Sequence, residues 1–162
     1  MTTAPPLPTV LTLPSSGPVF YLFVPGSPDP AGSPKPVFLG GDRSRLAIRW
    51  QKGHTWTAAI RRALMEVIPE EKRPLYRGPV LGYLHFVMPK PLKPKFKVPA
   101  TPPDVDKLER AILDGFVWRG KDQKARPILV EDDARFIGVG TYESFASDSE
   151  PTGVRIWVWA AP

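Results

Sequence analysis

The sequence contains no cysteine and only two histidines, His54 and His85. Disulfide scaffolds, thiol catalysis and zinc sites built from cysteine and histidine are therefore excluded, and any metal ion must be held by oxygen ligands. Long apolar segments are also absent, since no run is longer than that at 19–24, whereas a membrane-spanning helix needs about 18 apolar residues. The N-terminus lacks the charged and apolar regions of a signal peptide. These absences predict a soluble, cytoplasmic protein with no membrane partner.

Acidic residues are fewer than basic ones: 16 Asp+Glu stand against 22 Lys+Arg, for a formal net charge of +6. This balance favours a polyanionic partner such as nucleic acid.

Proline is abundant, at 22 of 162 residues, against a usual share of about 5%, which predicts long irregular connections. The length predicts a single domain over 19–162. Residues 1–18 carry five prolines and no charge, and we expect them to form a Pro-rich tail.

Hydrophobic patterning predicts an α/β (α+β) fold, in which a small mixed β-sheet packs with two main helices in the order β-α-β-α-β-β. The first helix is expected to begin at Thr55 and to end before Pro69, and the second to cover 104–118. Irregular segments are expected at 27–53, at a basic, proline-stiffened arm over 89–103, and at a connector over 119–126. The predicted strands are 19–24, 79–88, 128–130, 136–142 and 154–159.

The helical periodicity also predicts which side chains are buried. In the first helix the expected core stripe is Trp56, Ile60, Ala63, Leu64 and Val67, and in the second it is Val105, Leu108, Ile112 and Phe116. Core packing accounts for Trp56, Trp118, Trp157 and Trp159, so Trp50 is the remaining candidate for stacking on an unpaired base.

Two acidic motifs are the candidates for chemistry. Asp104 and Asp106 stand at the start of the second predicted helix, and Asp132-Asp133 lies between two predicted strands. Carboxylates in such positions can converge on a hard cation such as Mg²⁺ or Mn²⁺. A structural alternative exists for each motif: Asp104 is a good N-cap, Asp106 and Glu109 have capping-box spacing, and an acidic pair after a strand is common in turns.

The two motifs, in PPDVDKLERAILDGF at 102–116 and EDDARF at 131–136, resemble the signature of the RusA-like Holliday junction resolvases. In that family, Pro-Asp-x-Asp-Asn-x-x-Lys-x-x-x-Asp at a helix start is followed by Asp-Asp-x-Gln-Val on the next strand. Gly26-Ser27-Pro28 and the lysines between 90 and 97 are similar to the turn and the basic stretch of the family. The order of elements agrees along 19–160, and the interval between Asp106 and Asp133 is about eight residues longer than usual in the family.

The resemblance implies a role for each matching residue. Asp104, Asp106 and Asp133 match the catalytic carboxylates that bind the metal ion, with Asp132 as an adjacent acid. Arg110 stands where the family has its catalytic lysine, so it can stabilise phosphate charge but cannot transfer protons. Lys107 replaces an asparagine, and Arg135 and Phe136 replace Gln and Val. Asp114 is left out of the site, as a partner of Arg110 one helical turn away.

The function implied by the resemblance is Mg²⁺-dependent, structure-selective cleavage of four-way (Holliday) DNA junctions by paired nicks in DNA recombination and repair. Mn²⁺ is a possible substitute for Mg²⁺, and a two-fold symmetric junction favours a homodimer. A bacterial or phage-infected cell is the expected host. A nuclease for other branched DNA and a non-catalytic basic DNA-binding module remain alternatives. The expected DNA-binding residues are Lys90, Lys93, Lys95, Lys97, Arg43, Arg45, Arg49, Lys52 and Lys107.

Overall fold

A four-stranded mixed sheet forms the centre of the computed structural model, which describes residues 20–30, 34–38, 46–50, 54–119, 122 and 124–161. The strand order is β1-β8-β4-β7. Strand β8 pairs antiparallel with both β1 and β4, whereas β4 and β7 are parallel. The expected tail over 1–18 lies outside the described residues. The four strands are β1 (Phe20–Pro25), β4 (Val80–Met88), β7 (Phe136–Phe145) and β8 (Gly153–Ala160).

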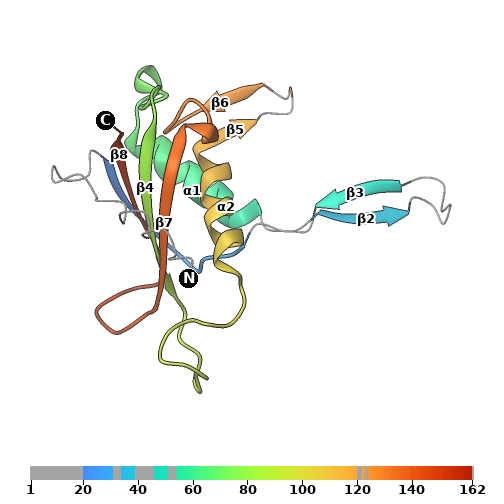
Figure 1. Cartoon of the computed structure of the whole chain (residues 1–162), viewed down its shortest axis with the longest axis vertical. Helices are drawn as coiled ribbons and strands as arrows, with labels where there is room; N and C mark the ends of the chain where they lie inside the picture. The colour runs from blue at the N-terminus through green and yellow to red at the C-terminus, as the bar shows by residue number, and fades with distance from the viewer. Residues whose placement is uncertain are drawn as a thin grey trace, which may run out of the picture.

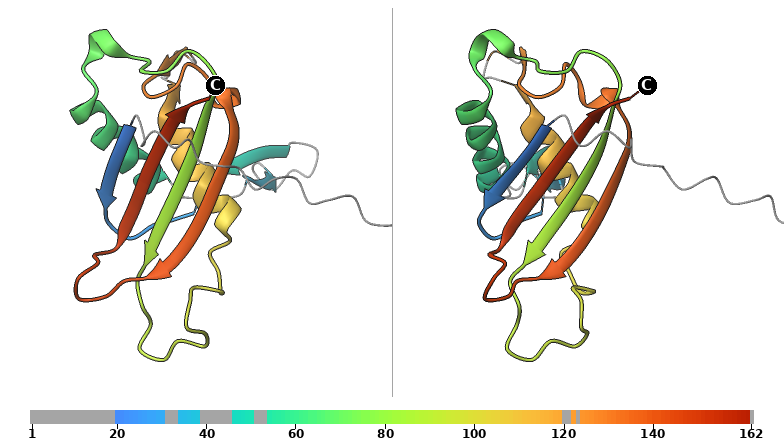
Figure 2. Two further views of the ribbon diagram at one scale, coloured as in Figure 1. Left: turned by 60° about the vertical axis from the view of Figure 1, so that its left-hand side comes forward. Right: turned by 90° about the vertical axis from the view of Figure 1, so that its left-hand side faces the viewer.

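Two helices, α1 (His54–Val67) and α2 (Val105–Phe116), pack against the same face of this sheet (Figure 1, Figure 2). The main elements follow the order β1-α1-β4-α2-β7-β8, which confirms the predicted α+β fold with its mixed sheet. The helices contain 14 and 12 residues. No helix in the described part of the chain is long and apolar enough to span a membrane.

Helix α1 is amphipathic because bulky apolar residues recur every four positions. Trp56, Ile60 and Leu64 are buried as expected, but Val67 is 51% exposed and Ile68 takes the buried position after it. The prediction for Val67 is therefore wrong by one residue. The proline that follows Ile68 has no N–H to continue the helix, so α1 ends where the sequence predicts.

The two helices contact each other closely at one point. The buried Thr57 hydroxyl donates a hydrogen bond of 3.0 Å to the Ala111 carbonyl oxygen. One turn further along α2, a Cβ added to Gly115 would stand 2.9 Å from Cγ2 of Ile60. Gly115 is thus the residue that lets the helices approach, which fixes α2 relative to the sheet.

Two hairpins occupy segments that were expected to be irregular. Strands β2 (Pro34–Phe38) and β3 (Leu46–Trp50) pair antiparallel within the predicted loop over 27–53, and the hairpin stands away from the main sheet (Figure 1). Strands β5 (Val117–Arg119) and β6 (Ala125–Pro127) form the second hairpin. The predictions of a loop over 27–53, a helix to residue 118 and a connector over 119–126 are wrong here, because β-branched and aromatic residues favour paired strands.

The predicted strand over 128–130 is instead a buried anchor. Ile128, Leu129 and Val130 are buried, but only Val130 makes a ladder contact, a single parallel bridge to Tyr76. Backbone N–H groups of residues 128 and 129 donate to the Phe116 carbonyl oxygen at the end of α2. This anchor fixes the start of the following turn, which carries Asp132 and Asp133.

Gly115→Ala will lower the free energy of unfolding by about 1–2 kcal/mol, because the strain of overpacking the helix contact exceeds the gain in helix propensity. Urea unfolding measures the change. Gly78→Ala is the matched control, since a Cβ there meets nothing within 4 Å, and it should stay within about 0.5 kcal/mol of wild type. A Gly115→Ala protein as stable as wild type would contradict the close helix contact.

Candidate functional site

A basic arm, residues 89–103, connects β4 to α2 and extends away from the sheet (Figure 1). Its four lysines, Lys90, Lys93, Lys95 and Lys97, are exposed, and the arm contains no acidic residue. The Lys95 ammonium lies 5.3 Å from the centroid of the Phe96 ring. Because these charges have no acidic neighbours within the arm, they are suited to bind a polyanion.

The first acidic motif follows directly at the start of α2. Asp104 is the N-cap residue, but its side chain makes no capping hydrogen bond. Its Oδ2 instead accepts a hydrogen bond of 2.6 Å from the Lys107 ammonium, and this bond raises the pKa of Lys107. Glu109, the expected capping-box partner of Asp106, accepts a hydrogen bond from the Thr141 hydroxyl. The capping alternative is thus not realised by either aspartate, and Lys107 neutralises Asp104.

The second acidic motif lies at the other end of α2, in the 3₁₀ turn η2 (Asp133–Arg135). The Asp132 carboxylate caps this turn by accepting a hydrogen bond of 2.9 Å from the Ala134 N–H. Asp132 and Asp133 line a small cavity of about 80 Å³ together with Leu113, Asp114 and Val117. We call this the acidic cavity.

Asp114 is the residue that the sequence analysis left out of the site and that the structure brings to it. Its spacing from Asp106 and Arg110 placed all three on one exposed stripe of α2, and the expected ion pair is confirmed, with Arg110 Nε 4.0 Å from Asp114 Oδ2. What the spacing did not reveal is which end of the helix meets the second motif. The structure shows that it is the end that carries Asp114.

The two acidic motifs are not brought together. Asp106 and Asp114 are eight residues apart on one helix, which separates them by about 12 Å along its axis, and Asp132 and Asp133 lie at the Asp114 end. Within the described residues, no three acidic or histidine side chains are grouped so that they could hold one metal ion. The carboxylates Asp104, Asp106 and Asp133 suit Mg²⁺ chemically, but their positions do not fit a single shared ion.

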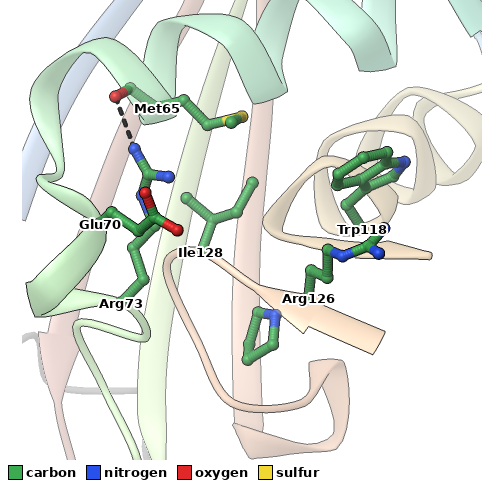
Figure 3. Close-up of a pocket in the computed structure, with 7 residues that line it drawn as sticks. Met65, Glu70, Arg73, Trp118, Arg126 and Ile128 are labelled. Atoms are coloured by element: carbon green, nitrogen blue, oxygen red, sulfur yellow. Dashed lines mark hydrogen bonds between the residues drawn. The ribbon is translucent and has the colours of Figure 1, made fainter. Parts of the chain in front are cut away.

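A second, larger cavity lies beside the end of α2, and we call it the arginine–tryptophan cavity (Figure 3). Its volume is about 470 Å³, and Trp118 and Arg126 stand across it from Arg73, Glu70 and Ile128. The Arg126 guanidinium lies 4.8 Å from the Trp118 ring centroid. An aromatic ring beside cationic groups is a suitable surface for a nucleotide. The lining residues are Met65, Glu70, Arg73, Trp118, Arg126, Pro127 and Ile128.

Core packing was expected to account for four tryptophans, and Trp118 packs against the core as expected, although it also lines this cavity. Trp56 and Trp159 are buried, which confirms the expectation for these two. Trp118 and Trp157 are only half-buried. Trp118 follows the helix in an extended strand, so it and Val117 point to opposite sides, and each lines a different cavity.

Arg61 on α1 interacts with one residue from the lining of each cavity, Trp118 and Asp114. Its guanidinium lies 5.4 Å from the Trp118 ring centroid, on α1 rather than on the β5–β6 hairpin that carries Arg126. Burial lowers the pKa of Arg61, while the charge of Asp114 raises it. The Arg61 Nε is buried and has no hydrogen-bond partner within the described residues. One cation thus interacts both with the aromatic ring of Trp118 and with the carboxylate of Asp114.

Arg73 has a structural role in the wall of the arginine–tryptophan cavity. Its guanidinium donates hydrogen bonds of 2.8 Å to the carbonyl oxygens of Ile68 and Met65 at the end of α1, and Figure 3 shows the bond to Met65. The last carbonyl groups of a helix have no partner within the helix, so these bonds satisfy them. The cavity is therefore shaped by a residue that also terminates α1.

The remaining predicted DNA contacts are not placed. Arg43, Arg45 and Lys52 lie outside the described residues, and of Arg49 only its backbone position in β3 is described.

Arg73→Met will lower the free energy of unfolding by about 1–2 kcal/mol, because two helix-end carbonyl groups lose a charged donor. Arg62→Met removes an exposed arginine from the same helix and should change stability by less than about 0.5 kcal/mol. Chemical denaturation of both variants makes the comparison. Equal stabilities of the two variants would show that Arg73 does not cap α1.

Comparison with known proteins gives no relative, since neither a family model nor a curated protein matches this chain. The resemblance to the junction resolvases therefore rests on the residues quoted for it.

Proposed function

We propose that this chain is a Mg²⁺-dependent endodeoxyribonuclease for branched DNA, with four-way junctions as its first candidate substrate. The observation that carries the proposal is the acidic cavity of Asp114, Asp132 and Asp133, which stands beside the cations Arg110 and Arg61. Carboxylates flanked by cations suit a phosphodiester, because the cations attract the phosphate while the carboxylates can polarise a water molecule.

The metal ion is part of the proposal through the resemblance. Mg²⁺, or Mn²⁺ in its place, would screen phosphate charge and acidify a bound water. Asp106 and Asp133 cannot ligate one ion while α2 is a continuous helix between them. We therefore assign no step of the reaction to an ion shared by these two residues. Arg110 lies on the stripe between both ends and can stabilise phosphate charge near either one.

DNA would be held mainly by the basic arm. Its lysines lie beside the first acidic motif, and the stripe Asp106, Arg110 and Asp114 runs from there to the acidic cavity. A strand bound by the arm could follow this stripe toward the arginine–tryptophan cavity, where Trp118 offers a surface for a base. A two-fold symmetric junction needs two such surfaces, which favours a homodimer. Such an enzyme would act in the cytoplasm of a bacterial or phage-infected cell.

A non-catalytic DNA-binding module is the second candidate. It is favoured by the separation of the two acidic motifs and by the ion pair that neutralises Asp104. In this alternative the basic arm binds DNA in the same way, but the carboxylates have no part in hydrolysis. A nuclease for another branched DNA would share the site and differ only in substrate.

Asp133→Asn will reduce Mg²⁺-dependent nicking of a synthetic four-way junction by at least about a hundredfold, because a carboxylate that interacts with the ion or with water is lost. Asp106→Asn should behave alike if both ends of α2 serve the reaction, and Asp114→Asn should also lose activity because Asp114 lines the same cavity as Asp133. Single-turnover cleavage on a denaturing gel measures the rates, with linear duplex as the comparison substrate.

Asp148→Asn is the control, since Asp148 is an exposed aspartate outside both motifs. Binding of the junction by each variant is measured separately. If wild type binds the junction but does not nick it in Mg²⁺ or Mn²⁺, the DNA-binding module is correct. Cleavage of flaps or forks in preference to four-way junctions would assign another branched substrate.

The basic arm will account for a large part of the salt dependence of DNA binding. Replacing Lys93, Lys95 and Lys97 together by Ala should reduce the slope of log K against log salt by about 0.9 for each lost phosphate contact. The control removes the same number of charges elsewhere, at Arg62, Lys72 and Arg77, which are exposed outside the arm. A similar slope in the two triple variants would show that the arm has no special role.

A further inference from the structure

One wall of the arginine–tryptophan cavity belongs to the short 3₁₀ turn η1 (Glu70–Lys72), which follows α1. Three residues complete one turn of a 3₁₀ helix, so Glu70 and the C-cap residue Arg73 lie on the same side of η1. Both residues line the cavity, and Figure 3 shows them across it from Trp118 and Arg126. This wall therefore offers a hydrogen-bond acceptor and a hydrogen-bond donor to whatever enters the cavity.

The two groups on this wall differ in how firmly they are held. Arg73 is fixed, because its Nε and one Nη donate hydrogen bonds of 2.8 Å to the carbonyl oxygens of Ile68 and Met65. A guanidinium has five N–H groups, so donors remain for another acceptor. The Glu70 carboxylate forms no hydrogen bond or ion pair with any residue that the structure describes. Its two oxygens are therefore available to accept hydrogen bonds from a ligand.

The opposite wall pairs an aromatic ring with a cation. The Arg126 guanidinium lies 4.8 Å from the Trp118 ring centroid, and one of its Nη atoms donates a 2.8 Å hydrogen bond to Asp122. The Arg126 side chain is 46% exposed, and its other N–H groups can bind a phosphate oxygen. Unpaired bases stack both on aromatic rings and on guanidinium planes. This wall can therefore hold a base together with the phosphate attached to it.

The size and charge of the cavity suit a single nucleotide. Its volume of about 470 Å³ lies within the usual range of small-molecule sites, about 300–1,000 Å³. Its charged lining residues are the cations Arg73 and Arg126 and the anion Glu70. The lining therefore favours a ligand with an anionic group, and the carboxylate on the η1 wall directs that group toward Arg126 on the other side.

We propose that this cavity binds an unpaired nucleotide and selects guanine. The pairing edge of guanine places two donors, N1–H and the N2 amino group, beside the acceptor O6, and the other bases of DNA do not combine these three groups. The Glu70 carboxylate can accept from both donors while Arg73 donates to O6, and the base stacks on the Trp118–Arg126 wall. Reading the pairing edge in this way requires a base that is not paired to another strand.

The inference deepens the proposed function and rests on it in one respect, because it takes a DNA strand as the source of the nucleotide. A free guanine mononucleotide offers the same base edge and a phosphate, so the experiment includes both sources. Base selection at this cavity would restrict cleavage to branched DNA that exposes a guanine at the corresponding distance from the acidic cavity.

The experiment measures binding in EDTA, which prevents Mg²⁺-dependent nicking. Isothermal titration calorimetry compares deoxyguanosine monophosphate with thymidine monophosphate, and fluorescence anisotropy compares a labelled thymidine oligonucleotide with the same strand carrying one central guanine. Wild type should prefer guanine by about tenfold, because thymine presents a single donor to the carboxylate.

Glu70→Gln should remove most of this preference and leave thymine binding within about twofold of wild type, because one of the two acceptor oxygens becomes a donor. Glu71→Gln is the matched control, since Glu71 is an exposed neighbour on η1 that does not line the cavity, and it should retain the preference. Trp118→Leu should weaken binding of both bases about tenfold, because stacking is tolerant of base identity. Trp118→Phe keeps an aromatic ring and should retain most of the affinity, and thermal unfolding checks that each variant folds.

Equal affinity of wild type for guanine and thymine in both formats would overturn the proposal, as would a preference that Glu71→Gln reduces as much as Glu70→Gln does. A preference seen in the oligonucleotide alone supports it with a DNA strand as the source, and one seen with the mononucleotide alone supports it with a free nucleotide. Binding is measured without cleavage, so the two proposals fail separately. Guanine selection by a protein that does not nick keeps this inference and loses the proposed function, whereas nicking without guanine selection does the reverse.

Discussion

Strands β4 and β7 run parallel, and the positions of the charged motifs follow from this pairing. Parallel neighbours cannot be joined by a tight turn, so the chain must return along the sheet before β7 begins. Helix α2 is that return. The basic arm and the first acidic motif consequently lie where β4 ends, and the second acidic motif lies where β7 starts. The two acidic motifs therefore lie at opposite ends of α2, although a single connection between neighbouring strands carries both of them.

The same sheet gives the molecule two chemically different sides. On the helical side, cations and carboxylates are interleaved along α2 and around the two cavities, and Arg61 interacts with both an aromatic ring and an acid. On the side opposite the helices, the Trp157 ring lies against the rings of Tyr21 and Tyr83, and Arg155 is paired with Glu150. Strand alternation produces this division from a single stretch of chain, because successive residues of β4 and β8 belong to opposite sides.

The sequence predicts the elements whose signals are local. Period-four apolar residues mark α1, the following proline marks its end, and the buried β4 and β8 are dense in apolar residues. The sequence does not predict the β2–β3 hairpin, because prolines dominate its segment. The pairing of the two strands also joins residues that are well apart in the chain. The predicted second helix is two residues too long at its C-terminal end, because Val117 and Trp118 continue the apolar composition of the helix. Their side chains suit a strand better.

The site was less predictable than the fold. Both acidic motifs are visible in the sequence, and the pairing of Arg110 with Asp114 follows from helical spacing. Which end of α2 meets the second motif depends on strand direction, and hydrophobic periodicity does not encode direction. The interval between the motifs contains the β5–β6 hairpin, whose half-buried Trp118 packs against the core and also lines a cavity. No local pattern predicts that a tryptophan shares these two environments.

The junction between α2 and β5 separates the two cavities through a single peptide unit. Val117 lines one cavity and Trp118 lines the other. The position of each residue relative to the end of α2 therefore decides which cavity it lines. Substitutions at this point change one wall at a time. Loss or gain of one residue would instead exchange both side chains and turn the indole toward the carboxylates. The chain should therefore accept changes of residue type here far more readily than changes of length.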